Sequence, residues 1–169
     1  YNSYNKYINQ HYTVIDVTRR ICKDVEEALA YKVGYDTDNE VSGLALCIPE
    51  DTDGDGANDR FSIRIWKLSN GRLEFKSCIR DDIDNTEINA LFTDIDGYNE
   101  VLSGLDTALA GEEPNRYIPT RFEYMSINKR VLLSIKPAAL NTGASQNRNV
   151  NGPVSTEFCV RNKDNLDDI

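Results

Sequence analysis

The first thirty or so residues constrain the fold most, because they carry a helical pattern that is long for the domain. Apolar side chains recur mostly three, four or seven residues apart, at Tyr4, Ile8, Tyr12, Ile15, Cys22, Val25 and Leu29. This spacing places them on one face of an α-helix. No Gly or Pro interrupts the pattern before Gly34. Such a helix is about 45 Å long at about 1.5 Å per residue, so part of it is expected to project from the domain.

The start of the chain gives a second expectation about this helix. The first residue is Tyr1, and no capping residue precedes the helical pattern. We therefore expect the helix to continue upstream in the natural protein. Within the sequence itself, no apolar run reaches the roughly 18–20 residues needed to span a bilayer, and no signal peptide is present.

Length and charge bound the class of protein. The 169 residues, 40% of them hydrophobic, suit one domain with a core. We expect a helix at residues 1–32 and a globular part at 33–169 of the same domain. The net charge of -9 argues against sequence-independent binding to nucleic acid or anionic lipid, because both need a basic surface. No nucleic-acid partner is predicted.

The period of the apolar pattern changes after Gly34. Runs with alternating apolar residues follow at 44–48, 61–65 and 73–76, the period of two expected for β-strands. Asn70-Gly71 lies between the last two runs and predicts a two-residue type I′ hairpin. The segment from Leu44 to Cys78 is therefore predicted to form a three-stranded antiparallel meander.

The second half of the chain has a weaker pattern at first. Residues 80–119 are rich in Asp and Gly, and only a short helix around 87–92 is predicted there. Strand patterns return at 121–126, 131–135 and 154–160, and the polar tail is expected to fray. One long N-terminal helix packed on an antiparallel β-sheet gives the predicted α+β class.

The acidic loop at 51–59 is the one stretch with evident chemistry. Its Asp residues at relative positions one, three, five and nine, with Gly at six, match the front of a calcium loop. We predict a structural Ca²⁺ site with ligands from Asp51, Asp53, Asp55, the carbonyl of Ala57, and Asp59. The match is partial, because position twelve is Ser62 instead of a bidentate Glu. The alternative is a solvated acidic loop without a metal.

The four cysteines are Cys22, Cys47, Cys78 and Cys159, and none forms a C-x-x-C pair. Scattered cysteines in even number favour disulfides in an exported protein over a zinc site, with four free thiols as the alternative. A bridge between Cys47 and Cys78 is conceivable if their strands are neighbours. Sequence alone does not choose among the three possible pairings.

No catalytic constellation is evident. His11 is the only histidine and lies in the projecting part of the helix, where a pocket and an orienting partner are not expected. No nucleophile elbow, phosphate loop or Cys-His pair is present. The adjacent carboxylates Asp81-Asp82 and Glu112-Glu113 are more typical of solvated loops. We therefore predict that the protein is not an enzyme.

Five segments carry a resemblance to a known family: Val25-Glu26-Glu27-Ala28, the acidic loop leading into 61–68, Asn70-Gly71-Arg72-Leu73, 130–135 and 155–162. With the order of the predicted elements, they resemble the type IV pilin-like family. Within it, the chain is most similar to W-class minor pilins and to the related J-type minor pseudopilins of type II secretion. The resemblance covers nearly the whole chain.

The resemblance implies a structural subunit that helps to assemble or prime a pilus-like filament. It implies an upstream hydrophobic segment that anchors the subunit in the inner membrane, and other pilin or pseudopilin subunits as partners. The location implied is the periplasmic or extracellular face, then a cell-surface filament. Side chains on the projecting half of the helix, Tyr4, Tyr7, Ile8 and Tyr12, are expected to contact neighbouring subunits. Alternatives are a type II secretion minor pseudopilin, a pilus-borne adhesin that uses 80–119, and, least favoured, a secreted calcium-dependent enzyme.

Overall fold

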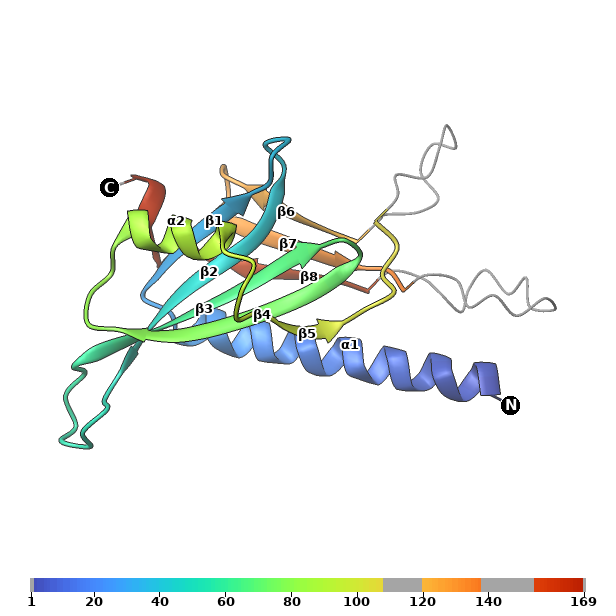
Figure 1. Ribbon diagram of the computed structural model, residues 1–169, viewed down its shortest axis with the longest axis horizontal. Coiled ribbons are helices and arrows are strands. Elements are labelled where there is room, and N and C mark those ends of the chain that lie inside the picture. Colours follow the sequence, from blue (N-terminus) through green and yellow to red (C-terminus); the bar gives the residue numbers. More distant parts are fainter. Residues whose placement is uncertain (1, 108–119, 138–153, 169) are drawn as a thin grey trace.

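The computed structural model describes residues 2–107, 120–137 and 154–168, with side chains from Thr13 onward (Figure 1). The elements follow in the order α1 (Asn2–Glu27), β1 (Ala30–Tyr35), β2 (Val41–Glu50), β3 (Arg60–Ser69), β4 (Arg72–Arg80), α2 (Asn85–Thr93), β5 (Asn99–Leu102), β6 (Arg121–Met125), β7 (Arg130–Ile135), β8 (Val154–Cys159), β9 (Asp164–Asn165) and the 3₁₀-helix η1 (Leu166–Asp168).

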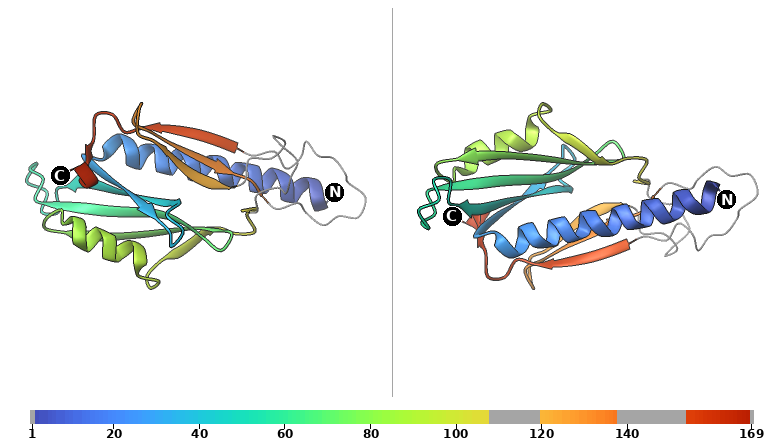
Figure 2. Two further views of the ribbon diagram at one scale, coloured as in Figure 1. Left: turned by 90° about the horizontal axis from the view of Figure 1, so that it is seen from above. Right: turned by 90° about the horizontal axis from the view of Figure 1, so that it is seen from below.

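The strands of these described segments form two sheets. Six strands in the order β5-β4-β3-β2-β1-β9 make the first sheet, and β6-β7-β8 make the second. All neighbours are antiparallel except β9, which runs parallel to β1. Figure 2 shows α1 running along the side where the two sheets approach each other.

The predicted α+β class, with one antiparallel sheet under a long helix, is wrong: the described part of the chain is mostly β and forms two sheets. The last strands do not extend the meander, because β7 is paired on both sides within its own sheet, by β6 and by β8. The end of the predicted helix, after Glu27, is also wrong, because part of it forms a strand. Residues Ala30 and Tyr31 open β1, and the helix ends at Glu27.

The predictions of single elements from local sequence signals were more accurate than the prediction of the fold class. The predicted meander is confirmed, since β2 pairs with β3 and β3 with β4, both antiparallel. The type I′ hairpin is confirmed by positive φ angles of 50° at Asn70 and 72° at Gly71. The short helix around 87–92 is confirmed as α2. Its first turn is capped by the Asp84 carboxylate, which accepts the N–H groups of Thr86 and Glu87.

The larger core joins α1 to both sheets. The helix contributes a stripe of four buried side chains, Val14, Val17, Ile21 and Val25. The second sheet contributes Val131, Leu133, Ile135 and Phe158. This stripe differs from the predicted one, because Ile15 and Cys22 are only half-buried and Leu29 is 55% exposed. The buried face is therefore turned toward the β-branched residues, which pack well against strands.

A smaller core lies on the opposite face of the first sheet, under α2. Ile88, Leu91 and Phe92 of α2 pack there with residues of β2 and β3. The ring of Phe92 approaches Gly34 so closely that a Cβ on Gly34 would lie 2.5 Å from it. Only glycine fits at this position of β1, and α2 is thereby held close to the strand.

The C-terminal tail is ordered, so the expectation that it frays is wrong. β9 pairs with the start of β1, at Ala30 and Tyr31, and Leu166 is buried in the smaller core. The ammonium group of Lys32, a side chain that is 5% exposed, forms an ion pair with Asp167. The tail thus closes the edge of the first sheet.

The first turns of α1 extend past the ends of the strands (Figures 1 and 2). The side chains predicted to contact other subunits, Tyr4, Tyr7, Ile8 and Tyr12, lie outside the described set, as does His11. Within the described residues, neither α-helix combines the length and hydrophobicity that crossing a bilayer requires.

Candidate functional site

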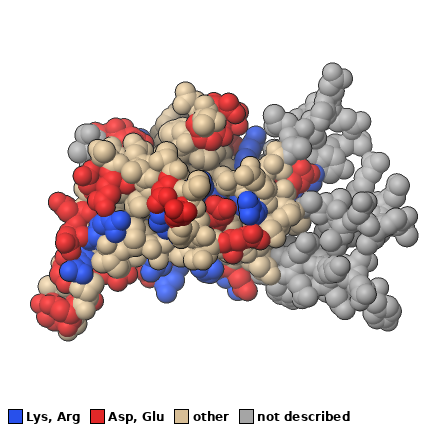
Figure 3. All heavy atoms as spheres, in the orientation of Figure 1, with Lys and Arg blue, Asp and Glu red and all other residues tan. Residues whose placement is uncertain are grey.

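The acidic loop joins β2 to β3 and projects from one end of the first sheet. Its base is the strand pair Glu50–Arg60, and every residue from 51 to 59 is exposed. In Figure 1 the loop is the extended hairpin at the lower left, and in Figure 3 the same corner carries a cluster of carboxylates. The sheet therefore presents these groups to solvent on a defined support.

Three of the predicted ligands lie together. One carboxylate oxygen from each of Asp51, Asp53 and Asp55 lies within 4.8 Å of the other two. Ca²⁺ holds its oxygen ligands at about 2.3–2.6 Å, so oxygens on opposite sides of one ion are about 5 Å apart. The three carboxylates are therefore close enough to share a cation, although exposed acidic groups also gather without one.

Backbone hydrogen bonds hold the Asp51 carboxylate in place. It accepts the N–H of Gly54 at 2.7 Å and the N–H of Gly56 at 2.8 Å. Both glycines have positive φ angles, 80° and 88°, which direct their N–H groups inward at no steric cost. The Asp53 carboxylate accepts the N–H of Asp55 at 3.1 Å. Hydrogen bonds from the backbone of the loop itself thus set its curvature and position its carboxylates.

These bonds also keep the Asp51 side chain charged. The N–H groups of Gly56 and then Gly54 hold the pKa of Asp51 below its ordinary value. Because the pKa is lower in the folded loop than in the unfolded chain, the bonds stabilise the loop above the unfolded-state pKa. This stabilisation is lost as the pH falls through the folded-state pKa, and the Asp51 carboxylate is charged throughout the neutral range.

The other predicted ligands are placed differently. The Asp59 carboxylate accepts the N–H of Thr52 at 2.8 Å and the hydroxyl of Thr52 at 2.6 Å. These two bonds lower the pKa of Asp59, and they close the loop across its base. The N–H of Ala57 donates to Asp55 at 2.7 Å. Ser62, at position twelve of the calcium pattern, is buried within β3.

Sequence reasoning missed a buried polar cluster under α1. The Asp24 carboxylate is 4% exposed, forms an ion pair with Arg64 of β3, and accepts the indole N–H of Trp66 at 3.0 Å. The guanidinium of Arg20 lies 5.2 Å from the ring centroid of Trp66 and 5.5 Å from that of Phe75. This cluster fixes the helix on the first sheet.

All four cysteines are free thiols in this structure. The condition for a Cys47–Cys78 bridge is not met, because Ile63 of β3 pairs with both of them and lies between them. Two strand spacings of about 4.8 Å exceed the roughly 7 Å limit for the Cα atoms of a disulfide. Burial, and then the neighbouring Cys78, raise the pKa of Cys47 to about 12, so it stays a thiol.

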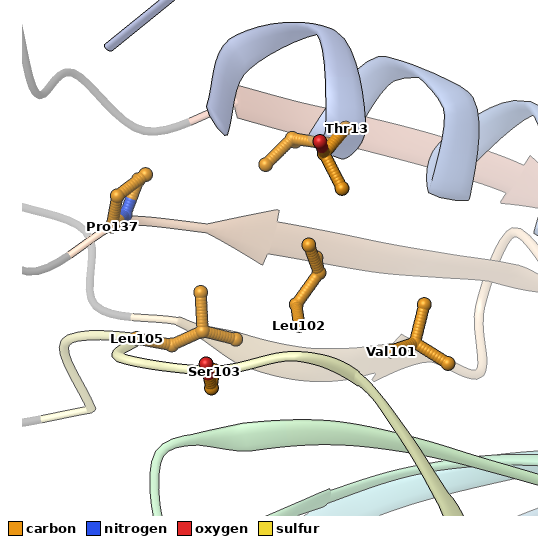
Figure 4. Close-up of a pocket in the computed structure, with 7 residues that line it drawn as sticks. Thr13, Val101, Leu102, Ser103, Leu105 and Pro137 are labelled. Atoms are coloured by element: carbon orange, nitrogen blue, oxygen red, sulfur yellow. The ribbon is translucent and has the colours of Figure 1, made fainter. Parts of the chain in front are cut away.

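A pocket of about 280 Å³ lies between α1 and β5 (Figure 4). The labelled side chains around it are those of Thr13, Val101, Leu102, Ser103, Leu105 and Pro137. None of its lining residues titrates, so the pocket offers no general acid or base. Asp81, one of the paired carboxylates, is exposed and bonds to Arg60 at 2.9 Å, whereas Glu112-Glu113 lies outside the described residues.

Comparisons with known proteins complete this description. No family model, no curated protein and no solved structure matches the chain.

Proposed function

We propose that the chain is a non-enzymatic subunit of a type IV pilus-like filament, a minor pilin that helps to assemble or prime it. Its partners would be other pilin or pseudopilin subunits, and its location the cell envelope surface. The proposal rests on the sequence resemblance and on one structural observation, the division of α1 into two parts.

The observation is that the described side chains of α1, from Thr13 onward, pack along the second half of the helix. From Val14 to Val25 the helix buries its apolar stripe against both sheets. The buried Asp24 adds a polar bond to Trp66 of β3. The first turns continue past the strands (Figure 1). A helix held rigidly at one end presents its other end in a fixed direction, which suits contact between subunits along a filament.

The test is incorporation of the subunit into filaments in the natural host. Tyr4→Asp with Ile8→Asp places two charges on the extending part of α1. The control is Lys23→Asp, at a side chain that is 72% exposed within the packed part. We expect about tenfold less of the double variant in sheared filaments, detected by gold-labelled antibody, because charges at a packed interface are costly.

Normal incorporation of the Tyr4→Asp, Ile8→Asp variant would contradict the proposed role of α1 in contacting other subunits. Labelling of secretion-system filaments, with none on pili, would assign the subunit to type II secretion instead. Both variants must show the unfolding midpoint of the natural sequence, so that a loss of incorporation reports assembly and not folding.

We also propose that the acidic loop binds Ca²⁺ as a structural ion. The carrying observation is the proximity of the Asp51, Asp53 and Asp55 oxygens, within 4.8 Å of one another. Three carboxylates so close repel one another, and a hard divalent cation removes that repulsion. Because the loop closes the β2–β3 hairpin, the ion would stiffen a projecting surface.

Calorimetry with Ca²⁺ tests this site. Asp53→Ala with Asp55→Ala removes two ligands, so affinity is expected to fall about 100-fold or more. Asp81→Ala with Asp82→Ala removes the same charge outside the loop and is expected to change affinity less than about threefold. Equal binding by both double variants, or no heat from the natural sequence, would refute the assignment.

A further inference from the structure

A cleft of about 460 Å³ lies beside the C-terminal tail. It is bounded by the turn between β6 and β7, the segment after β8, β9 and η1, with Tyr31 of β1 also contributing. Every residue that lines it is described. Its charged residues are Lys129, Arg161, Lys163, Asp164 and Asp168.

The charge of this cleft differs from that of the molecule. Three cations and two carboxylates line it, whereas the whole chain carries a net charge of -9. Lys163 is engaged, since its ammonium donates to the carbonyl of Glu26 at 3.0 Å. Lys129 lies 3.9 Å from Asp168, a long ion pair. Arg161 is exposed and has no carboxylate within ion-pair distance among the described residues, so its guanidinium is available to a ligand.

Lys129 adopts a left-handed backbone conformation, which is unusual for a lysine. Its φ angle is +54°, in the left-handed region where Gly, Asn and Asp fit best. Its carbonyl accepts the N–H of Val160 at 2.9 Å, which ties the turn to the end of β8. Strained positions of this kind occur disproportionately at binding sites. A lysine placed here brings a cation to the mouth of the cleft.

A hydrogen-bonded pair of tyrosines, one buried and one half-buried, supplies a further donor. Tyr31 is 1% exposed, and its hydroxyl lies 2.9 Å from that of Tyr124, which also accepts the Asn165 amide at 3.5 Å. Two hydroxyls carry two protons, and one proton joins the pair. When Tyr124 is the donor, the Tyr31 proton is left without an acceptor among the described residues, and Tyr31 is the member of the pair that lines the cleft. Burial, and then the bond to Tyr124, raise the pKa of Tyr31, so this group stays a donor at neutral pH.

We propose that this cleft binds the oxyanion of a carboxylate or phosphate group, through the Arg161 guanidinium, the Lys129 ammonium and the unused tyrosine proton. An oxyanion accepts from all three, and Arg matches its two oxygens with two parallel N–H groups. The charged residues that line the cleft sum to a net charge of +1. A singly charged carboxylate is therefore favoured over a phosphate dianion, because Asp164 and Asp168 repel the second negative charge.

The test is an NMR titration of the ¹⁵N-labelled chain with sodium acetate and, separately, sodium phosphate, at constant ionic strength. We expect saturable shifts of the amides of Lys129, Arg161 and Asn165 in the millimolar range, with acetate binding more tightly than phosphate. Arg161→Gln with Lys129→Gln is expected to weaken binding about tenfold or more, since both charge-assisted bonds are lost. Tyr31→Phe should weaken it several-fold.

Arg72→Gln is the matched control, because it removes a half-exposed guanidinium from β4, outside the cleft. Saturable binding by this control, with none by the double variant, supports the site. Tighter binding of phosphate than of acetate assigns the oxyanion to a phosphate source and overturns the charge argument. Shifts that grow linearly, or equal binding by all variants, overturn the proposal. The Arg161 side chain is exposed, so its substitution decides the question even where Tyr31→Phe alters folding.

Discussion

Replacing Asp24 by Ala is expected to lower the free energy of unfolding by about 3–5 kcal/mol, the typical cost of removing one partner from a buried ion pair. The Asp24 side chain is 4% exposed and the Arg64 side chain 29% exposed, so the guanidinium left behind is only partly hydrated, and its nearest remaining carboxylate is that of Glu50 at 3.9 Å. The buried indole N–H of Trp66 loses its only described acceptor at the same time. Both losses weaken the contact between α1 and β3.

Urea denaturation of the Asp24→Ala variant gives the free energy of unfolding directly. The control is Asp16→Ala, on the same helix at an exposed position, where a change below about 0.5 kcal/mol is expected. A double variant with Arg64→Met separates the two losses, because it removes the guanidinium that has lost its close carboxylate and leaves only the indole unsatisfied. Its stability should lie above that of Asp24→Ala alone. A loss under about 1 kcal/mol for Asp24→Ala would contradict the assigned role.

The signal for this cluster is present in the sequence but is not unique. Asp24 is three residues after Ile21 and four before Ala28, both of which are buried, so an acidic side chain falls on the apolar face. A buried carboxylate needs a cation and a donor. Which cation supplies it depends on strand register, since Arg64 and Trp66 are forty or more residues away and lie on adjacent positions of one face of β3.

The fold was predictable wherever the determining contacts are local. The meander and its hairpin follow from alternation and from Asn70-Gly71, which act within a few residues. The division into two sheets is not local. Strand patterns at 121–126, 131–135 and 154–160 are equally compatible with extending the first sheet or forming another. Pairing between strands far apart in sequence decided it.

The acidic loop shows the same limit on a smaller scale. Asp51, Asp53 and Asp55 alternate along a tight turn, so their spacing alone brings their oxygens together. Asp59 lies on the return path of the loop, and its position depends on how the chain closes on Thr52. The residues of the oxyanion cleft come from three distant segments, at 31, 129 and 160–168, and no spacing in the sequence indicates them.

Truncation after Lys163 is expected to cost at least about 3 kcal/mol, although the polar composition of the tail suggests that it contributes nothing. Leu166 is 5% exposed in the core under α2, and its loss leaves a cavity there. The ammonium of Lys32, a side chain that is 5% exposed, loses its carboxylate partner Asp167. Since Asp167 is 40% exposed, the cavity contributes the larger share.

Two variants separate these contributions in urea denaturation. Leu166→Ala in the full chain tests the cavity and should cost about 2–4 kcal/mol, whereas Asp164→Ala, at an exposed side chain, should cost under about 0.5 kcal/mol. In the truncated chain, Lys32→Met removes the buried charge and should recover part of the loss. If the truncated chain were as stable as the full one, pairing of β9 with β1 and burial of Leu166 would not contribute to stability. The recovery expected from Lys32→Met follows only if the tail neutralises the Lys32 ammonium in the full chain.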